Sequence, residues 1–339
     1  MSPPLEPRLA GATDAWGMIG GMPVEEPHLV SRVISRRFAD SGGLLAVFDI
    51  ATGRRRTGLG PDGFGYTGRL SPTDADAFER AWREVEDALP GALAVIDAGG
   101  PLDPATVAVL RDCVAMHWAR SADLIRLHDD VFRLARVRGI EELARRLEGD
   151  PRVEFSYRQA HHGLRPTSGE RRREARRIAE RIYDESVAGI ESSSYRADRM
   201  LELFEIARSS FRDSGVEVLI ASPGEELLIG DSPAKTVSKD GLRSGPFARV
   251  PLTDAGSVWM PVGPGAAIAL GRTSSYAKID PPMVEWLNRV QAGGGIDRVA
   301  CRPGSPLEAR LPSLLGSARP GLVDEPRSPR PTLERRQKP

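Results

Sequence analysis

Hydrophobic positions near the N-terminus predict a short hairpin followed by a helix. The apolar run Leu44–Ile50, the turn at Ala51-Thr52-Gly53 and the polar segment after it are typical of two antiparallel strands. Ser71-Pro72 is a helix start, and apolar residues then recur at helical spacing as far as about Leu89. Pro90 is predicted to end that helix.

The centre of the chain is predicted to be helical. Asp103-Pro104 begins what we expect to be the longest helix, ending near Arg138, and a shorter helix follows from Ile140 to Glu148. Residues 150–168 are predicted to be a long connection. Two further amphipathic helices complete this block, over about 170–189 and 194–213.

Strand patterns return after Ser214-Gly215. Val216–Ile220 and Leu227–Ile229 are predicted to form one hairpin across a turn at Gly224-Glu225. A second predicted strand pair, a helix and a closing strand follow: Val258–Val262 with Ala266–Leu270, Pro281 to about Gln291, and Arg298–Cys301.

Strands at both ends of a helical block predict an α+β fold. Hairpin connections dominate and no βαβ alternation is present, so the sheet should be mostly antiparallel, built from paired N- and C-terminal strands around the long helices. We expect three regions: a flexible N-terminal arm (1–26), a single α+β domain (27–303) with a helical insertion (about 71–213), and a Pro- and Arg-rich disordered tail (304–339).

Composition narrows the class of protein. The chain has 339 residues, with 47 basic and 47 acidic side chains and a formal net charge of zero. This balance removes the whole-protein argument for nucleic acid or an acidic membrane as partner, although a local patch could still bind one. Two distant cysteines, no signal-peptide pattern and no membrane-length apolar run predict a cytoplasmic protein without a membrane partner.

Familiar catalytic motifs are missing from the sequence. It contains no Walker phosphate loop, no GxGxxG after a strand, and no HExxH, GxSxG or CxxC motif. The commonest nucleotide-binding, metalloprotease and serine-hydrolase classes are therefore excluded. Any functional site must then be formed by individual polar residues outside these motifs.

The first candidate group is His28 with Arg36 and Arg37. A neutral imidazole can bind a metal or move protons, and the two arginines could hold an anion. The alternative is a loop histidine beside a solvated basic pair.

A second group lies on the predicted helices. Glu79 and Glu86 are seven residues apart and share a helix side. Glu86 could join a site built elsewhere, or both could be an exposed acidic stripe. Arg120 follows an apolar helix face and must find a carboxylate or another anion, which predicts either a structural ion pair or a substrate-holding arginine.

The third candidate is Asp231, which leaves an apolar strand at Gly230 and precedes Ser232-Pro233. An aspartate in this position is typical of a ligand-binding or catalytic carboxylate. Turn chemistry explains it equally well, since Asp and Ser side chains cap such bends.

Taken in order, these segments resemble a family of bacterial proteins of unknown function, the domain-of-unknown-function family numbered 4238. The resemblance covers about residues 27–303. It rests on short elements spread along the chain: His28 to Ala39 with its basic pair before Phe38, Val47 to Gly53, Glu79 and Glu86, Arg120-Ser121, Gly230 to Pro233, Trp259 to Pro264, and Asn288. Ser31 and Gly230 depart from the family pattern, which usually has proline and serine there. The resemblance implies an α+β architecture and no established reaction.

Two functions fit these residues. The first is a metal-assisted hydrolase of a phosphoester or nucleic-acid bond, with catalytic His28, Glu86, Arg120 and Asp231. In it, His28 and Asp231 hold a divalent metal, and the anionic substrate or nucleic acid is bound by three further residues: Arg36, Arg37 and Asn288. The second is a non-enzymatic binding or interaction protein in which the polar residues are structural. Sequence-specific DNA binding has less support, because no helix-turn-helix pattern is present.

Overall fold

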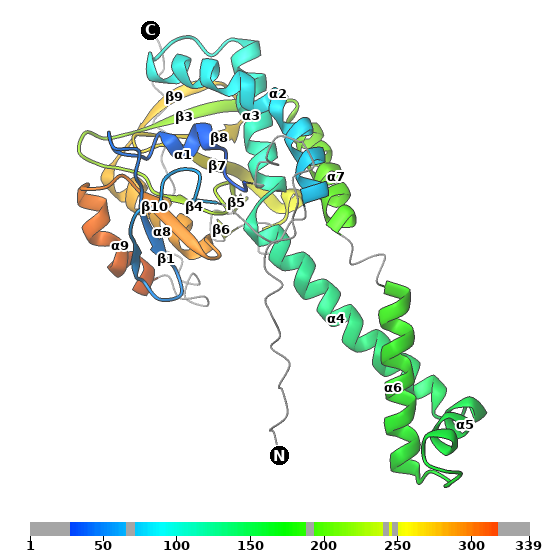
Figure 1. The fold of residues 1–339 in the computed structure, drawn as a ribbon. Helices are drawn as coiled ribbons and strands as arrows, with labels where there is room; N and C mark the ends of the chain where they lie inside the picture. The colour runs from blue at the N-terminus through cyan, green and yellow to red at the C-terminus, as the bar shows by residue number, and fades with distance from the viewer. Residues whose placement is uncertain (1–27, 66–71, 188–192, 240–243, 246–249, 318–339) are drawn as a thin grey trace, which may run out of the picture.

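The computed structural model has an α+β fold and describes residues 28–65, 72–187, 193–239, 244–245 and 250–317. Two mostly antiparallel sheets and their covering helices form a body, and a long helical arm projects from it (Figure 1). No helix among the described residues is long and apolar enough to cross a membrane.

The smaller sheet joins the two ends of the chain. Its antiparallel order is β2 (Arg55–Arg56), β1 (Ala46–Asp49), β10 (Arg298–Cys301) and β4 (Ile229–Gly230). The predicted N-terminal hairpin is confirmed by the β1–β2 pair. The predicted pairing of N- and C-terminal strands is confirmed by β1 and β10, which align Val47 with Ala300.

The larger sheet has six strands. Their order is β6 (Ser244–Gly245), β5 (Lys235–Ser238), β7 (Ala255–Gly263), β8 (Ala266–Gly271), β3 (Gly215–Ala221) and β9 (Ser275–Ile279). Among its described strands, only the β3–β9 pair is parallel. The predicted β7–β8 pair is confirmed.

The predicted hairpin between 216–220 and 227–229 is wrong. β3 pairs with β8 and β9, whereas β4 joins β10 in the other sheet. The apolar run that leads into β4 contacts three separate parts of the core. Leu227, Leu228 and Ile229 each belong to a different hydrophobic cluster. A strand buried between clusters reads in sequence like a hairpin strand, since both are short apolar runs.

Six of the helices that the structure describes cover the body: α1 (Arg32–Arg36), α2 (Pro72–Asp97), α3 (Pro104–Ala119), α7 (Ser193–Phe211), α8 (Pro281–Gly294) and α9 (Pro306–Ser317). The predicted end of α2 at Pro90 is wrong. Leu89, Leu93 and Ile96 lie on one buried face across the proline, and this packing outweighs the lost helical hydrogen bond.

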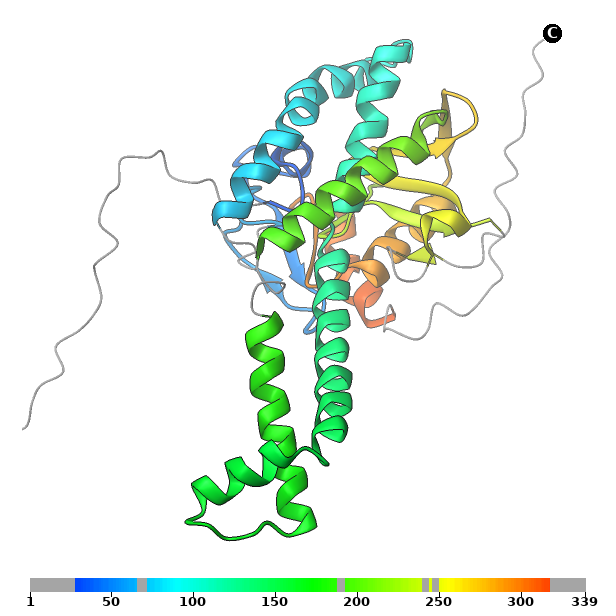
Figure 2. The same cartoon turned by 90° about the vertical axis from the view of Figure 1, so that its right-hand side faces the viewer.

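The arm consists of α4 (Ala122–Leu147), α5 (Pro151–Ala160) and α6 (Ser168–Val187), and Figure 2 shows α4 and α6 side by side. The predicted continuous helix from Asp103 to Arg138 is wrong. It ends at Ala119, and Ser121 caps a new helix by accepting a hydrogen bond from the Leu124 N–H. That helix continues through Gly139, where a second helix had been expected to begin.

Two predicted irregular regions contain helices. Residues 150–168 include α5, which Asp150 caps and Pro151 begins. The predicted tail begins with α9, because Leu307, Leu311, Leu314 and Leu315 recur at helical spacing and are buried. The predicted arm 1–26 and residues 318–339 lie outside the described part of the chain.

Candidate functional site

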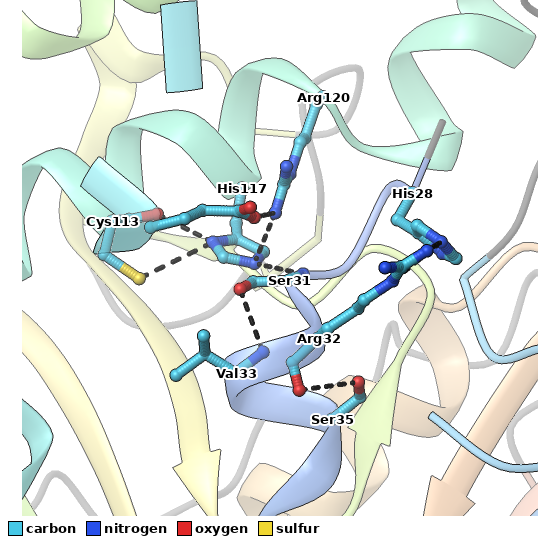
Figure 3. Close-up of polar contacts among 9 residues, drawn as sticks. His28, Ser31, Arg32, Val33, Ser35, Cys113, His117 and Arg120 are labelled. Atoms are coloured by element: carbon cyan, nitrogen blue, oxygen red, sulfur yellow. Dashed lines mark hydrogen bonds and ion pairs between the residues drawn. The ribbon is translucent and has the colours of Figure 1, made fainter. Parts of the chain in front are cut away.

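A largely buried polar cluster lies where α1, α2 and α3 meet, and we define it as Ser31, Glu86, His117 and Arg120. Figure 3 shows Ser31, His117 and Arg120 in this cluster. Arg120 directly follows α3, and its backbone N–H donates to the Met116 carbonyl. Its guanidinium donates through Nη2 to Glu86 Oε1 at 2.7 Å and lies over the Trp82 ring, 5.1 Å from the ring centroid. With 2% of its side chain exposed, Arg120 is an interior cation held by a carboxylate and an aromatic face.

His117 links this ion pair to the N-terminal segment. Its Nε2 accepts a 3.1 Å hydrogen bond from the Ser31 backbone N–H, so the ring proton is on Nδ1, 2.8 Å from the Cys113 carbonyl oxygen. Burial, reinforced by the positive charge of Arg120, lowers the pKa of His117 to about 3. The imidazole is therefore neutral at pH 7 and has both ring nitrogens engaged.

His117 lies on the apolar face of its helix, a position that predicts a core residue without a functional role. Its link to the N-terminal segment depends on a backbone N–H that is 86 residues earlier in the chain. No local pattern marks such a contact.

Glu86 is the anionic member of the cluster. Burial alone would raise its pKa, but the charge and hydrogen bond of Arg120 outweigh burial and hold the pKa below its ordinary value. Glu86 and Arg120 thus form an ion pair at neutral pH. The carboxylate that Arg120 was predicted to need is Glu86. The Glu79 side chain lies outside the described part of the chain.

His28 lies near this cluster but has its own partner. Its Nε2 accepts from Arg32 Nε at 3.1 Å and Nη2 at 2.8 Å, and Arg32 also pairs with Asp62 at 3.2 Å. Burial and then the Arg32 charge lower the pKa of His28. Because Nε2 accepts, the neutral ring carries its proton on Nδ1, and neither nitrogen presents a free lone pair to a metal in this arrangement.

Asp231 is used by the backbone. It is 4% exposed, and its carboxylate accepts from the N–H groups of Ile296, Asp297 and Arg298 at 2.7–2.9 Å. These contacts hold the loop before β10 against the end of β4. No hydrogen bond or ion pair joins Asp231 to His28, Glu86 or Arg120 in the described part of the chain.

The predicted substrate-binding residues are dispersed. Arg36 is exposed, whereas Arg37 makes a two-pronged ion pair with Asp97 at the edge of a pocket of about 400 Å³. Asn288 is buried; its Oδ1 accepts from the Leu228 N–H at 2.9 Å and its Nδ2 donates to the Glu226 carbonyl at 2.8 Å. Asp97 already neutralises Arg37, and Asn288 orders the segment before β4.

The sequence-predicted site is therefore only partly assembled. Glu86 and Arg120 are in contact and His28 is nearby, but Asp231 and Asn288 serve other parts of the fold. The described residues contain no group of three His, Cys, Asp or Glu side chains that could hold a metal ion. The divalent metal on His28 and Asp231 stays a prediction.

Comparison with known proteins gives no family assignment. No family model, curated protein or solved structure matches the chain. The resemblance described above thus stays a prediction, and function must be argued from this chain's own geometry.

Proposed function

We propose that this chain is a non-enzymatic binding protein whose polar cluster stabilises the body and whose helical arm contacts a protein partner. One observation carries the proposal. Arg120 and Asp231, two of the predicted catalytic residues, are buried. Arg120 pairs with a carboxylate of the same body, and Asp231 accepts hydrogen bonds from backbone N–H groups.

Burial favours the structural role for a simple reason. A substrate-holding arginine needs a path to a ligand, whereas Arg120 has Glu86 on one side and the Trp82 ring on another. Such an ion pair orients α2 against α3, and breaking it would leave a charge without its partner. Asp231 likewise ties the end of β4 to the turn before β10.

The arm supplies the second part of the proposal. Apolar side chains that are large and at least 46% exposed concentrate along it: Val131, Leu134, Val137, Phe155 and Leu164. Exposed apolar groups gathered on one projecting element are typical of protein interaction surfaces. The metal-assisted hydrolase, acting on an anionic substrate or nucleic acid, has less support, because the lone pairs of His28 Nε2 and Asp231 already accept hydrogen bonds.

The test is site-specific photo-crosslinking in cells. A photoreactive amino acid replaces Leu134 on the arm or, as control, the exposed Arg83 on α2. We expect a discrete protein adduct from position 134 and none from position 83, with the adduct identified by mass spectrometry. Equal background at both positions would contradict the interaction function.

The hydrolase alternative has its own measurement, metal content and metal-induced thermal stabilisation of the purified chain. A divalent ion bound by the wild type and lost in folded His28→Ala and Asp231→Ala variants would favour the hydrolase. We expect no bound ion and a destabilised Asp231→Ala variant.

A further inference from the structure

The two long sides of α4 differ in what covers them. On one side, Ile140, Ala144 and Leu147 are buried against α6 residues such as Ala175 and Ala179. Val131 and Leu134 face away from this side and are each 55% exposed, and Val137, at its flank, is 46% exposed. These three, flanked by Asp130 and Arg138, fall on one side of a helix with 3.6 residues per turn, and we call them the outer face of α4.

Leu134 is at the centre of this face and of the helix itself. It is the thirteenth of the 26 residues in α4. The sequence around it has a two-fold character: Val131 and Val137 lie three residues to either side, and Asp130 and Arg138 lie four residues to either side. A face whose apolar groups mirror each other while its charges are opposite is complementary to its own reversed copy.

We propose that the outer face of α4 pairs with the same face of a second copy of this chain, in antiparallel orientation about Leu134. This inference rests on the proposed interaction function and identifies its partner. Leu134 meets its own counterpart at the two-fold axis. The stem of Arg138 covers Val131 of the partner subunit, and its guanidinium reaches the partner subunit's Asp130.

Two exposed charges without a partner among the described residues support this choice of occupant. Arg126 and Arg138 form no hydrogen bond or ion pair with any described residue. Antiparallel pairing about Leu134 sets Arg126 opposite Glu142 of the partner subunit, and Arg138 opposite Asp130 of the partner subunit, each twice by symmetry. Asp130 now pairs with the exposed Arg133 of its own helix at 2.8 Å, a surface contact that is easily exchanged.

A parallel pair or an unrelated apolar partner fits less well. Parallel pairing would set Asp130 against Asp130 and Arg138 against Arg138, which repels. A purely apolar partner would leave the flanking charges desolvated without partners. The interface is short, with residues 126–142 covering about 24 Å of helix, so a concentration-dependent dimer is expected.

The test is sedimentation velocity of the full chain over a concentration series, with circular dichroism to verify folding. Leu134→Glu should weaken self-association about tenfold or more, and so should Asp130→Arg and Arg138→Asp singly. The double variant Asp130→Arg/Arg138→Asp should restore the dimer, since only antiparallel pairing exchanges these two positions. Ile206→Glu, an exposed apolar position on α7 of the body, and Arg173→Asp, an exposed arm position away from the outer face, are the matched controls and should leave the dimer unchanged.

A wild-type chain that stays monomeric throughout, or a double variant as weak as the single ones, overturns the self-pairing. The crosslinking experiment separates this failure from failure of the proposed function. An adduct between position 134 and a different protein would reject the second copy while retaining an interaction function. No adduct at position 134 would reject both.

Discussion

Arg120 and Glu86 form a 2.7 Å ion pair between the end of α3 and the middle of α2, with Arg120 almost completely buried. The pair joins two helices whose buried residues belong to the same hydrophobic cluster. Its energetic weight is asymmetric: forming a buried pair gains little net free energy, but removing one member leaves an uncompensated charge.

Arg120→Ala should therefore lower the free energy of unfolding by about 3 kcal/mol or more. Urea denaturation gives this value, with the exposed Arg83→Ala as control, which should stay within about 0.5 kcal/mol of wild type. An Arg120→Ala variant as stable as the control would return Arg120 to the substrate-holding role.

Asp231→Asn tests the carboxylate that orders the loop before β10. The amide group can present only one oxygen to three backbone N–H donors and adds two donors of its own. We expect a loss of about 2–3 kcal/mol in unfolding free energy. Asp297→Asn is the matched control, because its exposed side chain is not part of this contact; equal effects of the two substitutions would be inconsistent with a structural Asp231.

The pH dependence of stability should report His117. Its pKa in the folded state, about 3, lies below the ordinary value of 6.5. As the pH falls, His117 is therefore protonated near pH 6.5 in the unfolded chain, but only near pH 3 in the folded chain. Stability must then fall as pH falls through this window. Between about pH 7 and about pH 5 the loss from this residue should be about 2 kcal/mol.

His117→Gln separates this effect from other titrations. Glutamine offers an acceptor oxygen and an NH2 donor group in place of the two ring nitrogens, but it does not titrate. The variant should lose about 2 kcal/mol less than the wild type over the same pH interval. The lowered pKa of Glu86 acts in the same direction at lower pH, where its ion pair with Arg120 is lost on protonation. Parallel pH curves for wild type and His117→Gln would contradict a neutral, buried His117.

Local patterns were sufficient for much of this fold. The β1–β2 hairpin and the β7–β8 pair each join neighbouring segments, so alternation and turn residues were enough to predict them. The break between α3 and α4 was missed because Arg120-Ser121 interrupts an otherwise helical apolar spacing with only a capping serine. The α9 helix was missed because a compositional bias toward Pro and Ser hid four buried leucines.

In the candidate site, too, local patterns predict the need for a partner, and only the packing of distant segments decides which residue it is. The need of Arg120 for a carboxylate followed from its place on an apolar helix, but the identity of Glu86, 34 residues earlier, depends on how α2 packs on α3. Asp231 looked like a ligand because its position at a strand end is shared by catalytic and capping carboxylates. Only the fold places the N–H groups of Ile296, Asp297 and Arg298 around it.

The crossing of α4 and α6 in the arm depends on Gly139, since a Cβ there would lie 2.4 Å from Cε2 of the Tyr183 ring. A glycine inside a helix normally costs about 1 kcal/mol relative to alanine, so Gly139→Ala would stabilise an isolated helix. In this arm we expect Gly139→Ala to lower the free energy of unfolding by about 1–3 kcal/mol, because the ring must move and the two helices separate.

Hydrogen exchange of the α4 and α6 amides should accelerate in Gly139→Ala and slow again when Tyr183→Leu is added. Gly149→Ala is the control, as a Cβ there meets nothing within 4 Å, and its exchange should match wild type. Slower exchange in Gly139→Ala than in wild type would show that helix propensity outweighs the contact and that α4 and α6 do not need to approach this closely.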